Sequence, residues 1–168
     1  MSSVAVRFAR PEDWPAVAAL LIELGRGVAV GTADDTTHRM QFTGHLRRID
    51  SVTLVAEELD EPGTVLGVVD MEYHQRLGDH RPQARVNDVV VTEAARGRGV
   101  GRELLSRAEE LARKRGCFRM ALVTAAWREA SISFYRKEGW ADYGAWFVKP
   151  LSDAVGPGGA PAPDVDDT

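Results

Sequence analysis

Residues 95–105, ARGRGVGRELL, hold three glycines at alternate positions among three arginines, and an apolar helical pattern follows at once. Glycines let the backbone take unusual angles and let a ligand approach the N–H groups closely. The first N–H groups of a helix lack partners within it, and the helix dipole is positive there. Because Arg96, Arg98 and Arg102 add positive charge at this end, an anion among them would relieve the repulsion. The stretch therefore predicts a phosphate or pyrophosphate site.

Other interpretations of this turn fit less well. A P-loop would need a Gly-Lys-Ser/Thr ending, and no lysine is near. A dinucleotide fingerprint would need a further glycine where the chain has Arg102 or Leu104. A solvated basic turn, with Glu93 and Glu103 as local partners, is the remaining alternative. The apolar strand pattern before the turn and the amphipathic pattern after it favour the anion site.

Two stretches resemble motifs of the GNAT superfamily of N-acetyltransferases. VVVTEAARGRGVGRELL looks like its acyl-CoA-binding motif, Arg/Gln-x-x-Gly-x-Gly/Ala, and SISFYRKEGW looks like its FY-x-x-x-GF/W segment. The matching residues are Arg96, Gly99 and Gly101 in the first stretch and Phe134, Tyr135, Gly139 and Trp140 in the second. The order and spacing of the expected elements over residues 4–150 also fit the family.

The resemblance implies acetyl-CoA as cosubstrate and direct transfer of its acetyl group to a primary amine, from a small molecule or a peptide. In this family a central strand pair splays apart and the pantetheine lies in the gap, which implies backbone contacts from Val89, Val90 and Val91. The pyrophosphate contacts are then expected from the turn. Its residues are Arg96, Gly97, Arg98, Gly99, Val100, Gly101 and Arg102.

The chemistry needs an acid and a base. A primary amine has a pKa of about 10, so a base must remove its proton before it attacks the thioester. Tyr135 matches the family tyrosine that protonates the leaving thiolate, and a phenol can donate at neutral pH. For the base, relatives often carry Glu where this chain has Asn87, which cannot be a base but can orient a water. The neighbouring Asp88 is ionisable and is the candidate catalytic base. Adjacent strand residues face opposite sides, so the side chains of Asn87 and Asp88 are not expected on the same face of the sheet. Glu72 and His74 on the preceding strand are further candidates.

A non-catalytic acyl-CoA sensor is the rival interpretation. Asn87 is not an acid, and Arg128 and Ser131 stand where many relatives have Asn and Ala. This chain therefore lacks the Asn that contacts CoA in the family, and Arg128 is expected to pair with a phosphate or to lie in the neighbourhood of Glu129. The single cysteine, Cys117, is expected to be a packing residue. The histidines lack a ligand pattern, so no metal is expected.

These residues must be positioned by an α/β fold, with a GNAT-like, mixed, mostly antiparallel sheet, a splayed central strand pair and flanking helices. Alternation and turn signals predict strands at 4–9, 51–58, 64–75, 84–92, 117–125 and 145–151. Helices are predicted at about 14–24, 34–49, 100–115 and 128–139. Asp13 is expected to cap the first helix, and Met40, Phe42, Leu46 and Ile49 to form the apolar face of the second.

Bulk properties set the domain organisation. The length of 168 residues predicts one domain over 1–151, followed by a disordered acidic Pro/Gly/Ala tail over 152–168. The net charge of −4 is matched by the four aspartates of this tail, so no nucleic-acid surface is indicated. Neither a membrane-spanning run nor a secretory signal is visible, which predicts a cytoplasmic protein. A homodimer is an expectation from the family alone.

Overall fold

The chain forms one five-stranded sheet in a computed structural model that describes residues 4–26, 36–125 and 128–144. The strands lie in chain order, β1 (Val4–Phe8), β2 (Ser51–Glu58), β3 (Val65–His74), β4 (Gln83–Val91) and β5 (Met120–Leu122). The first four pair antiparallel, and β5 pairs parallel with β4. The mixed, mostly antiparallel sheet predicted from the sequence is confirmed.

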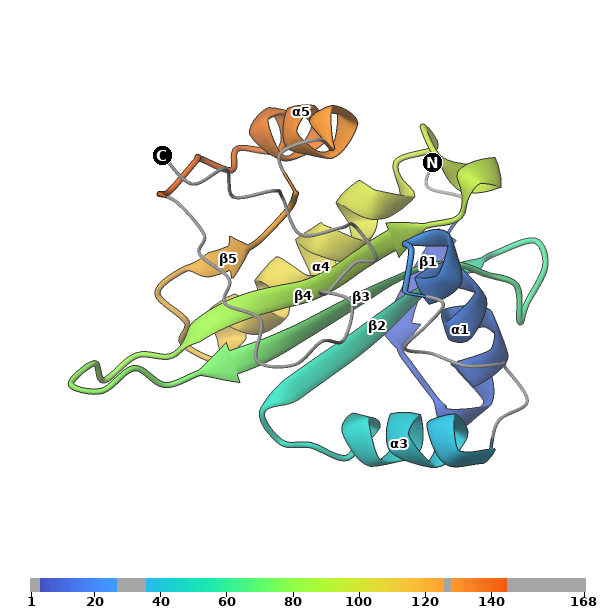
Figure 1. The fold of residues 1–168 in the computed structure, drawn as a ribbon, viewed down its shortest axis with the longest axis horizontal. Helices are drawn as coiled ribbons and strands as arrows, with labels where there is room; N and C mark the ends of the chain where they lie inside the picture. The colour runs from blue at the N-terminus through green and yellow to red at the C-terminus, as the bar shows by residue number, and fades with distance from the viewer. Residues whose placement is uncertain (1–3, 27–35, 126–127, 145–168) are drawn as a thin grey trace, which may run out of the picture.

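Helices cover both faces of this sheet (Figure 1). The long helix α4 (Val100–Lys114) connects β4 to β5 and packs on one face, and α5 (Glu129–Lys137) lies beyond the end of β5. On the opposite face lie α1 (Trp14–Glu23) and α3 (Thr36–Leu46). Short 3-10 turns, η1 (Pro11–Asp13) and η2 (Glu93–Ala95), precede α1 and the arginine–glycine turn.

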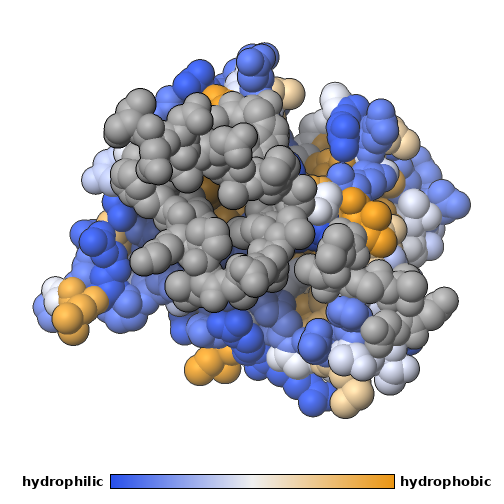
Figure 2. Space-filling view, in the orientation of Figure 1, coloured by the Kyte–Doolittle hydropathy of each residue, from blue (hydrophilic) through white to orange (hydrophobic). Residues whose placement is uncertain are grey.

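The sheet buries apolar side chains on both of its faces, which gives two hydrophobic cores. Along β2, Leu54 and Ala56 face α4 whereas Val55 faces α1, and all three are at most 1% exposed. The spacing of Val100, Leu104, Ala108 and Ala112 places one apolar stripe of α4 against the first core. On the surface drawn in Figure 2, the apolar atoms of the described residues form small separate patches among polar ones.

Gly67 lets α4 approach the sheet closely. A Cβ atom at this position would lie 2.8 Å from the Val90 carbonyl oxygen and 3.0 Å from Leu104 Cδ1. The first distance, to a backbone atom, is shorter than real Cβ atoms show, and the second is tighter than most side-chain contacts. The glycine in β3 therefore fixes how near α4 lies to the strand that leads into the turn.

The β3–β4 pairing contains a bulge. Met71 pairs with Val86 and Asp70 pairs with Asp88, so Asn87 is an extra residue on β4. Val86 and Val89 pack on the α4 side and Val90 on the α1 side. The two residues between Val86 and Val89 therefore share the α1 side. The expectation that Asn87 and Asp88 face opposite sides is wrong, because it assumed regular alternation through the strand.

Strand β5 is shorter than predicted. The expected strand over 117–125 is reduced to Met120–Leu122, which pairs with Ala84–Val86 of β4. Beyond Val86, β4 has no strand partner on that side within the described part of the chain. The two strands part there, which agrees with the predicted splay.

The helix predictions hold with corrections at the ends. Asp13 does not cap α1, because its carboxylate accepts hydrogen bonds from Arg10 N–H (2.7 Å) and from the Arg7 guanidinium (2.8 and 2.9 Å). In α3 only Phe42 is buried, whereas Met40 is 71% exposed. Ile49 lies past the end of this helix and is 86% exposed.

Some expectations fall outside the described residues. These are the strand at 145–151, the tail at 152–168 and the start of the second helix at residues 34 and 35. Among the helices that the structure describes, none is both long and apolar enough to cross a bilayer.

Candidate functional site

The arginine–glycine turn presents backbone donors at the start of α4. Gly97 and Gly99 have φ values of 78° and 85°, a left-handed conformation that favours glycine. The Arg98 N–H bonds to Ala95 O, and the Glu103 N–H closes the first helical turn on Gly99 O. Within the described chain, no acceptor lies at the N–H groups of Gly97, Gly99, Val100, Gly101 and Arg102. Five N–H groups are therefore available to an anion at the positive end of the helix dipole.

The arginines of the turn have partners distant in sequence. Arg98 pairs with Glu58 at 2.7 Å, and Arg102 pairs with Glu138 at 2.7 Å. Neither Arg98 nor Arg102 forms its ion pair with Glu93 or Glu103, the local partners of the solvated-turn alternative. The carboxylates of Glu58 and Glu138 already offset part of the positive charge, which the sequence argument did not foresee.

Arg96 differs from the other two arginines. Its Nε donates to Val91 O at 3.3 Å, so the side chain folds back over the end of β4. Among the described residues it pairs with no carboxylate, and it is exposed. Arg96 is therefore the arginine of the turn whose charge is most available to a bound anion.

The open edge of β4 leads directly into this turn. Val89 and Val91 direct their side chains toward α4, and Val90 points to the opposite core. The backbone of Val89–Val91 lies beyond the last β5 pair, Val86 with Leu122. An extended ligand can bond to this edge as an added strand and reach the free N–H groups at its end.

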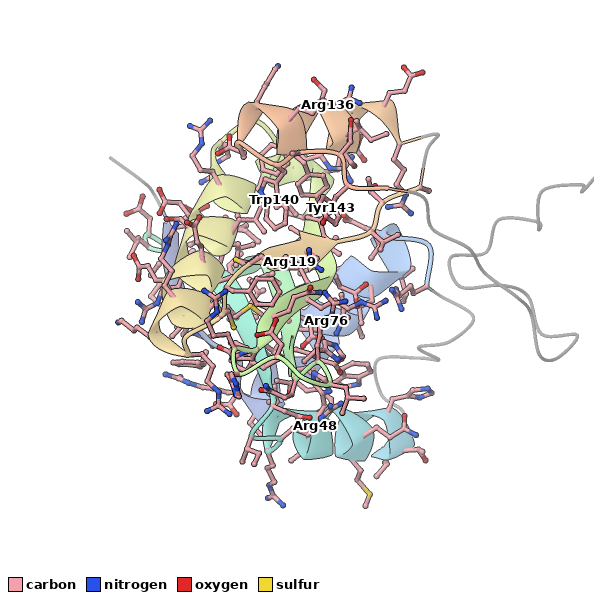
Figure 3. All side chains as sticks on the ribbon, turned by 90° about the vertical axis from the view of Figure 1, so that its left-hand side faces the viewer. Arg48, Arg76, Arg119, Arg136, Trp140 and Tyr143 are labelled. Atoms are coloured by element: carbon pink, nitrogen blue, oxygen red, sulfur yellow. The ribbon has the colours of Figure 1, made fainter. Side chains whose placement is uncertain are left out.

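The second motif packs against the first. A Cβ on Gly101 would lie 3.5 Å from Phe134 Cζ and 3.6 Å from Val91 Cγ2, so α5 touches the start of α4. Tyr135 is half-buried and contacts the rings of Phe134 (5.4 Å between centroids) and Trp140 (5.9 Å). Figure 3 shows Trp140 on the inner side of α5 and Arg136 on its outer side. Trp140 is thus a half-buried residue that packs against the core on the α4 side.

The phenol of Tyr135 is held in its protonated form. Burial raises its pKa above the ordinary value, and the charge of Arg128 only partly opposes this. Tyr135 packs with the core on the α4 side of the sheet, whereas Asn87 and Asp88 lie on the α1 side. The candidate acid and the candidate base therefore lie on opposite sides of β4.

Asp88 is a half-buried carboxylate that lies beside a guanidinium. Its Oδ1 lies 2.8 Å from the Arg26 guanidinium, which follows α1. Burial raises the pKa of Asp88, Arg26 lowers it, and the nearby Asp70 raises it again, with a net rise above the ordinary value. A carboxylate with a raised pKa is a better proton acceptor than an exposed one.

Asp70, on β3, bonds to residues of three other elements next to the bulge. Its Oδ1 accepts from His45 Nε2 (2.7 Å) and from Thr53 Oγ1 (2.8 Å). Its Oδ2 accepts from Asn87 Nδ2 at 3.2 Å. Burial opposes ionisation of Asp70, yet these donors, with His45 first, hold its pKa below the ordinary value. Asp70 in turn raises the pKa of His45.

Sequence reasoning gave no catalytic or positioning role to Asp70, His45, Thr53 or Arg26. One signal was available, because Asp70 interrupts the apolar run VLGVVDM in a strand that is buried on both sides. A charge at such a position needs partners. The partners lie on other elements, and no local pattern in the sequence identifies them.

The other candidate residues have structural partners. Glu72 pairs with Arg48 at 3.1 Å and lies 3.3 Å from His74 Nε2. Arg128 donates to the Leu24 carbonyl oxygen at 3.0 Å, so it connects the start of α5 to the end of α1 and not to Glu129. Cys117 packs against the first core. No cluster of three metal-ligating side chains occurs among the described residues.

Comparisons with known proteins agree with this geometry. The profile of the Acetyltransferase (GNAT) family matches residues 13–140. IAA acetyltransferase of Azospirillum brasilense is 31% identical over 140 residues, which cover 82% of this chain and 86% of that protein. Glucosamine 6-phosphate N-acetyltransferase 1 of Oryza sativa subsp. japonica is 40% identical over 78 residues, 44% of each chain. A crystal structure of a transcriptional regulator from Bacillus halodurans C-125 has the same fold, with a TM-score of 0.78, 21% identity and coverage of 88% of this chain and 99% of that one.

Proposed function

Because the chain belongs to the acetyltransferase (GNAT) family, we propose that it transfers the acetyl group of acetyl-CoA directly to a primary amine. The observation that carries this proposal is the continuous path from the open edge of β4 to five free N–H groups at the start of α4. A pantetheine arm fits the strand edge, and a pyrophosphate fits the N–H groups. Arg96 adds the available positive charge.

The acceptor is proposed to approach from the α1 side of β4. Asp88 removes a proton from the ammonium form, directly or through water, and the free amine attacks the thioester carbon. A backbone N–H of β4 stabilises the oxyanion that forms. When the intermediate collapses, the C–S bond breaks, the sulfur takes a proton from Tyr135, and the nitrogen gives up its second proton, which restores the phenol through water. The products are an N-acetyl amide and free CoA.

The proposal is tested by release of free CoA thiol from acetyl-CoA in the presence of different amines. The panel includes glucosamine 6-phosphate, aminoglycosides and peptides with free N-termini or lysines. Release that depends on one class of amine supports the proposal and identifies the acceptor class. If no amine in the panel increases release although acetyl-CoA binds, direct N-acetylation is contradicted for these classes.

A non-catalytic acyl-CoA sensor is a second candidate. It is favoured by Asn87 in place of an acid and by Arg128, whose contact with Leu24 takes it away from a phosphate. A sensor would raise its melting temperature with acetyl-CoA and show no amine-dependent thiol release. The same two measurements therefore separate the candidates.

A further inference from the structure

The hydrogen bond between Asn87 and Asp70 fixes which way the Asn87 carboxamide faces. Asp70 is ionised and can only accept, so the Asn87 atom 3.2 Å from its Oδ2 must be the NH2 group. Asn87 Oδ1 then points away from Asp70, and it accepts no hydrogen bond among the described residues. An oriented acceptor atom thus lies at the bulge.

The carboxylate of Asp70 is itself held in place. His45 and Thr53 both donate to its Oδ1, which leaves Oδ2 for Asn87. Thr53 is 7% exposed, and the Asp70 side chain is 16% exposed. Since three elements clamp the carboxylate, turning the Asn87 amide over would place its oxygen against a buried anion, which is strongly unfavourable.

The bulge also places Asn87 beside Asp88, at the point where β4 leaves β5. Resting on the proposed N-acetyltransferase activity, we infer that Asn87 Oδ1 accepts a hydrogen bond from the attacking amine, that Asp70 fixes this orientation, and that the arrangement selects primary amines over secondary amines. A neutral primary amine has two N–H groups and one lone pair. One N–H bonds to Asn87 Oδ1, the other to Asp88 or its water, and the lone pair attacks the carbonyl carbon.

A secondary amine cannot satisfy both groups. Its single N–H serves either Asn87 or Asp88 and leaves the other acceptor without a donor. The loss of one such hydrogen bond corresponds to about a tenfold effect. Asn87 is therefore the residue that discriminates, and Asp70 acts on it as a positioning residue.

The test compares kcat/KM for a primary amine and its N-methyl derivative, such as a peptide with N-terminal glycine and one with N-terminal sarcosine. In Asp70→Asn the new amide can donate to Asn87, so its carboxamide is free to turn. We expect kcat for the primary amine and its preference over the N-methyl form each to fall about tenfold, with unchanged acetyl-CoA affinity. Asp50→Asn is the matched control, because Asp50 is exposed and bonds to Arg48.

Thr53→Val separates positioning from stability. It removes one donor to Asp70 Oδ1 and leaves the Oδ2–Asn87 bond, so the melting temperature should fall while the preference stays. The inference is overturned if Asp70→Asn keeps the preference, or if Thr53→Val loses it in parallel with stability.

A measurement that does not depend on turnover tests this inference separately from the proposed function. The side-chain NH2 resonances of Asn87 in the NMR spectrum should move in Asp70→Asn and stay in place in Asp50→Asn. Unchanged resonances in Asp70→Asn would overturn the orienting role even if the wild type were active. An inactive wild type with the expected resonance change would refute the proposed function and the amine preference, and would leave the fixed amide orientation standing.

Discussion

At the scale of single residues, Asp88 shows how a neighbour sets the chemistry of a carboxylate. The charge of Arg26 opposes the rise in the pKa of Asp88 that burial causes. In Arg26→Gln we expect this pKa to rise further. The acidic limb of kcat at saturating amine should therefore move to higher pH, since Asp88 must be deprotonated to act as base.

Arg47→Gln is the control for this shift, because Arg47 is exposed and lies between α3 and β2. Its pH profile should coincide with that of the wild type. An acidic limb that moves to lower pH in Arg26→Gln, or does not move, would remove Asp88 from the mechanism.

Tyr135 gives the second test at this scale. In Tyr135→Phe the ring contacts with Phe134 and Trp140 remain, but the proton donor is lost. We expect kcat to fall by about 10²-fold or more, with acetyl-CoA affinity unchanged. Tyr143→Phe, at a side chain that is 86% exposed, should retain full activity. Equal activity of the two variants would contradict the acid role.

Some of these residues could be predicted from the sequence, and others could not. Tyr135 and the glycines of the turn belong to contiguous motifs, so local spacing was sufficient to select them. Arg26 and Asp70 act through partners that are far from them in sequence, such as Asp88 and His45. Long-range side-chain contacts of this kind leave no local pattern.

At the scale of elements, the turn before α4 and the end of the same helix provide a matched pair of glycines. Gly99 and Gly116 have φ values of 85° and 81°, and at both positions an added Cβ meets nothing within 4 Å. Substitution by alanine should lower the free energy of unfolding by a similar amount at each position, about 1–2 kcal/mol, because the left-handed conformation is strained for residues other than glycine.

Only Gly99→Ala should also weaken acetyl-CoA binding, because its N–H is one of the free donors and a shift away from the strained left-handed conformation would turn that N–H from the anion. Calorimetric titration of both variants measures the difference. Equal affinity would show that the turn does not hold the pyrophosphate.

The contact of α3 with the sheet should depend on pH. Asp70 raises the pKa of His45 above 6.5, so the protonated form is favoured in the folded state. This stabilisation is complete below the unfolded pKa and is lost as pH rises through the folded value. The melting-temperature difference between wild type and His45→Gln should therefore be larger at pH 5.5 than at pH 9. A constant or inverted difference would contradict the ion pair.

Element positions were largely predictable, whereas pairing details were not. The α4 helix follows from its apolar spacing and the stop at Gly116. The bulge at Asn87 depends on how β4 registers against β3, and side-chain alternation along one strand cannot reveal it. The early end of β5 likewise depends on where two distant segments separate.

At the scale of the whole molecule, one sheet with a core on each face holds the splayed edge in place. Leu104 is fully buried between α4 and β3, next to Gly67. Leu104→Ala should lower the free energy of unfolding by about 2–5 kcal/mol, measured by urea denaturation. Leu77→Ala, at a fully exposed loop position, should change it by less than about 0.5 kcal/mol. A small effect of Leu104→Ala would show that the α4 core does not support the fold as described.

The central claim is direct transfer of an acetyl group from CoA to an amine at the open edge of β4. The most direct measurement uses acetyl-CoA with an isotopic label in the acetyl group and quantifies products by mass spectrometry. The account predicts labelled N-acetyl amide and free CoA in equal amounts, with no labelled protein and no release without amine. Labelled acetate as the main product, or labelled protein that forms before the amide, would contradict it.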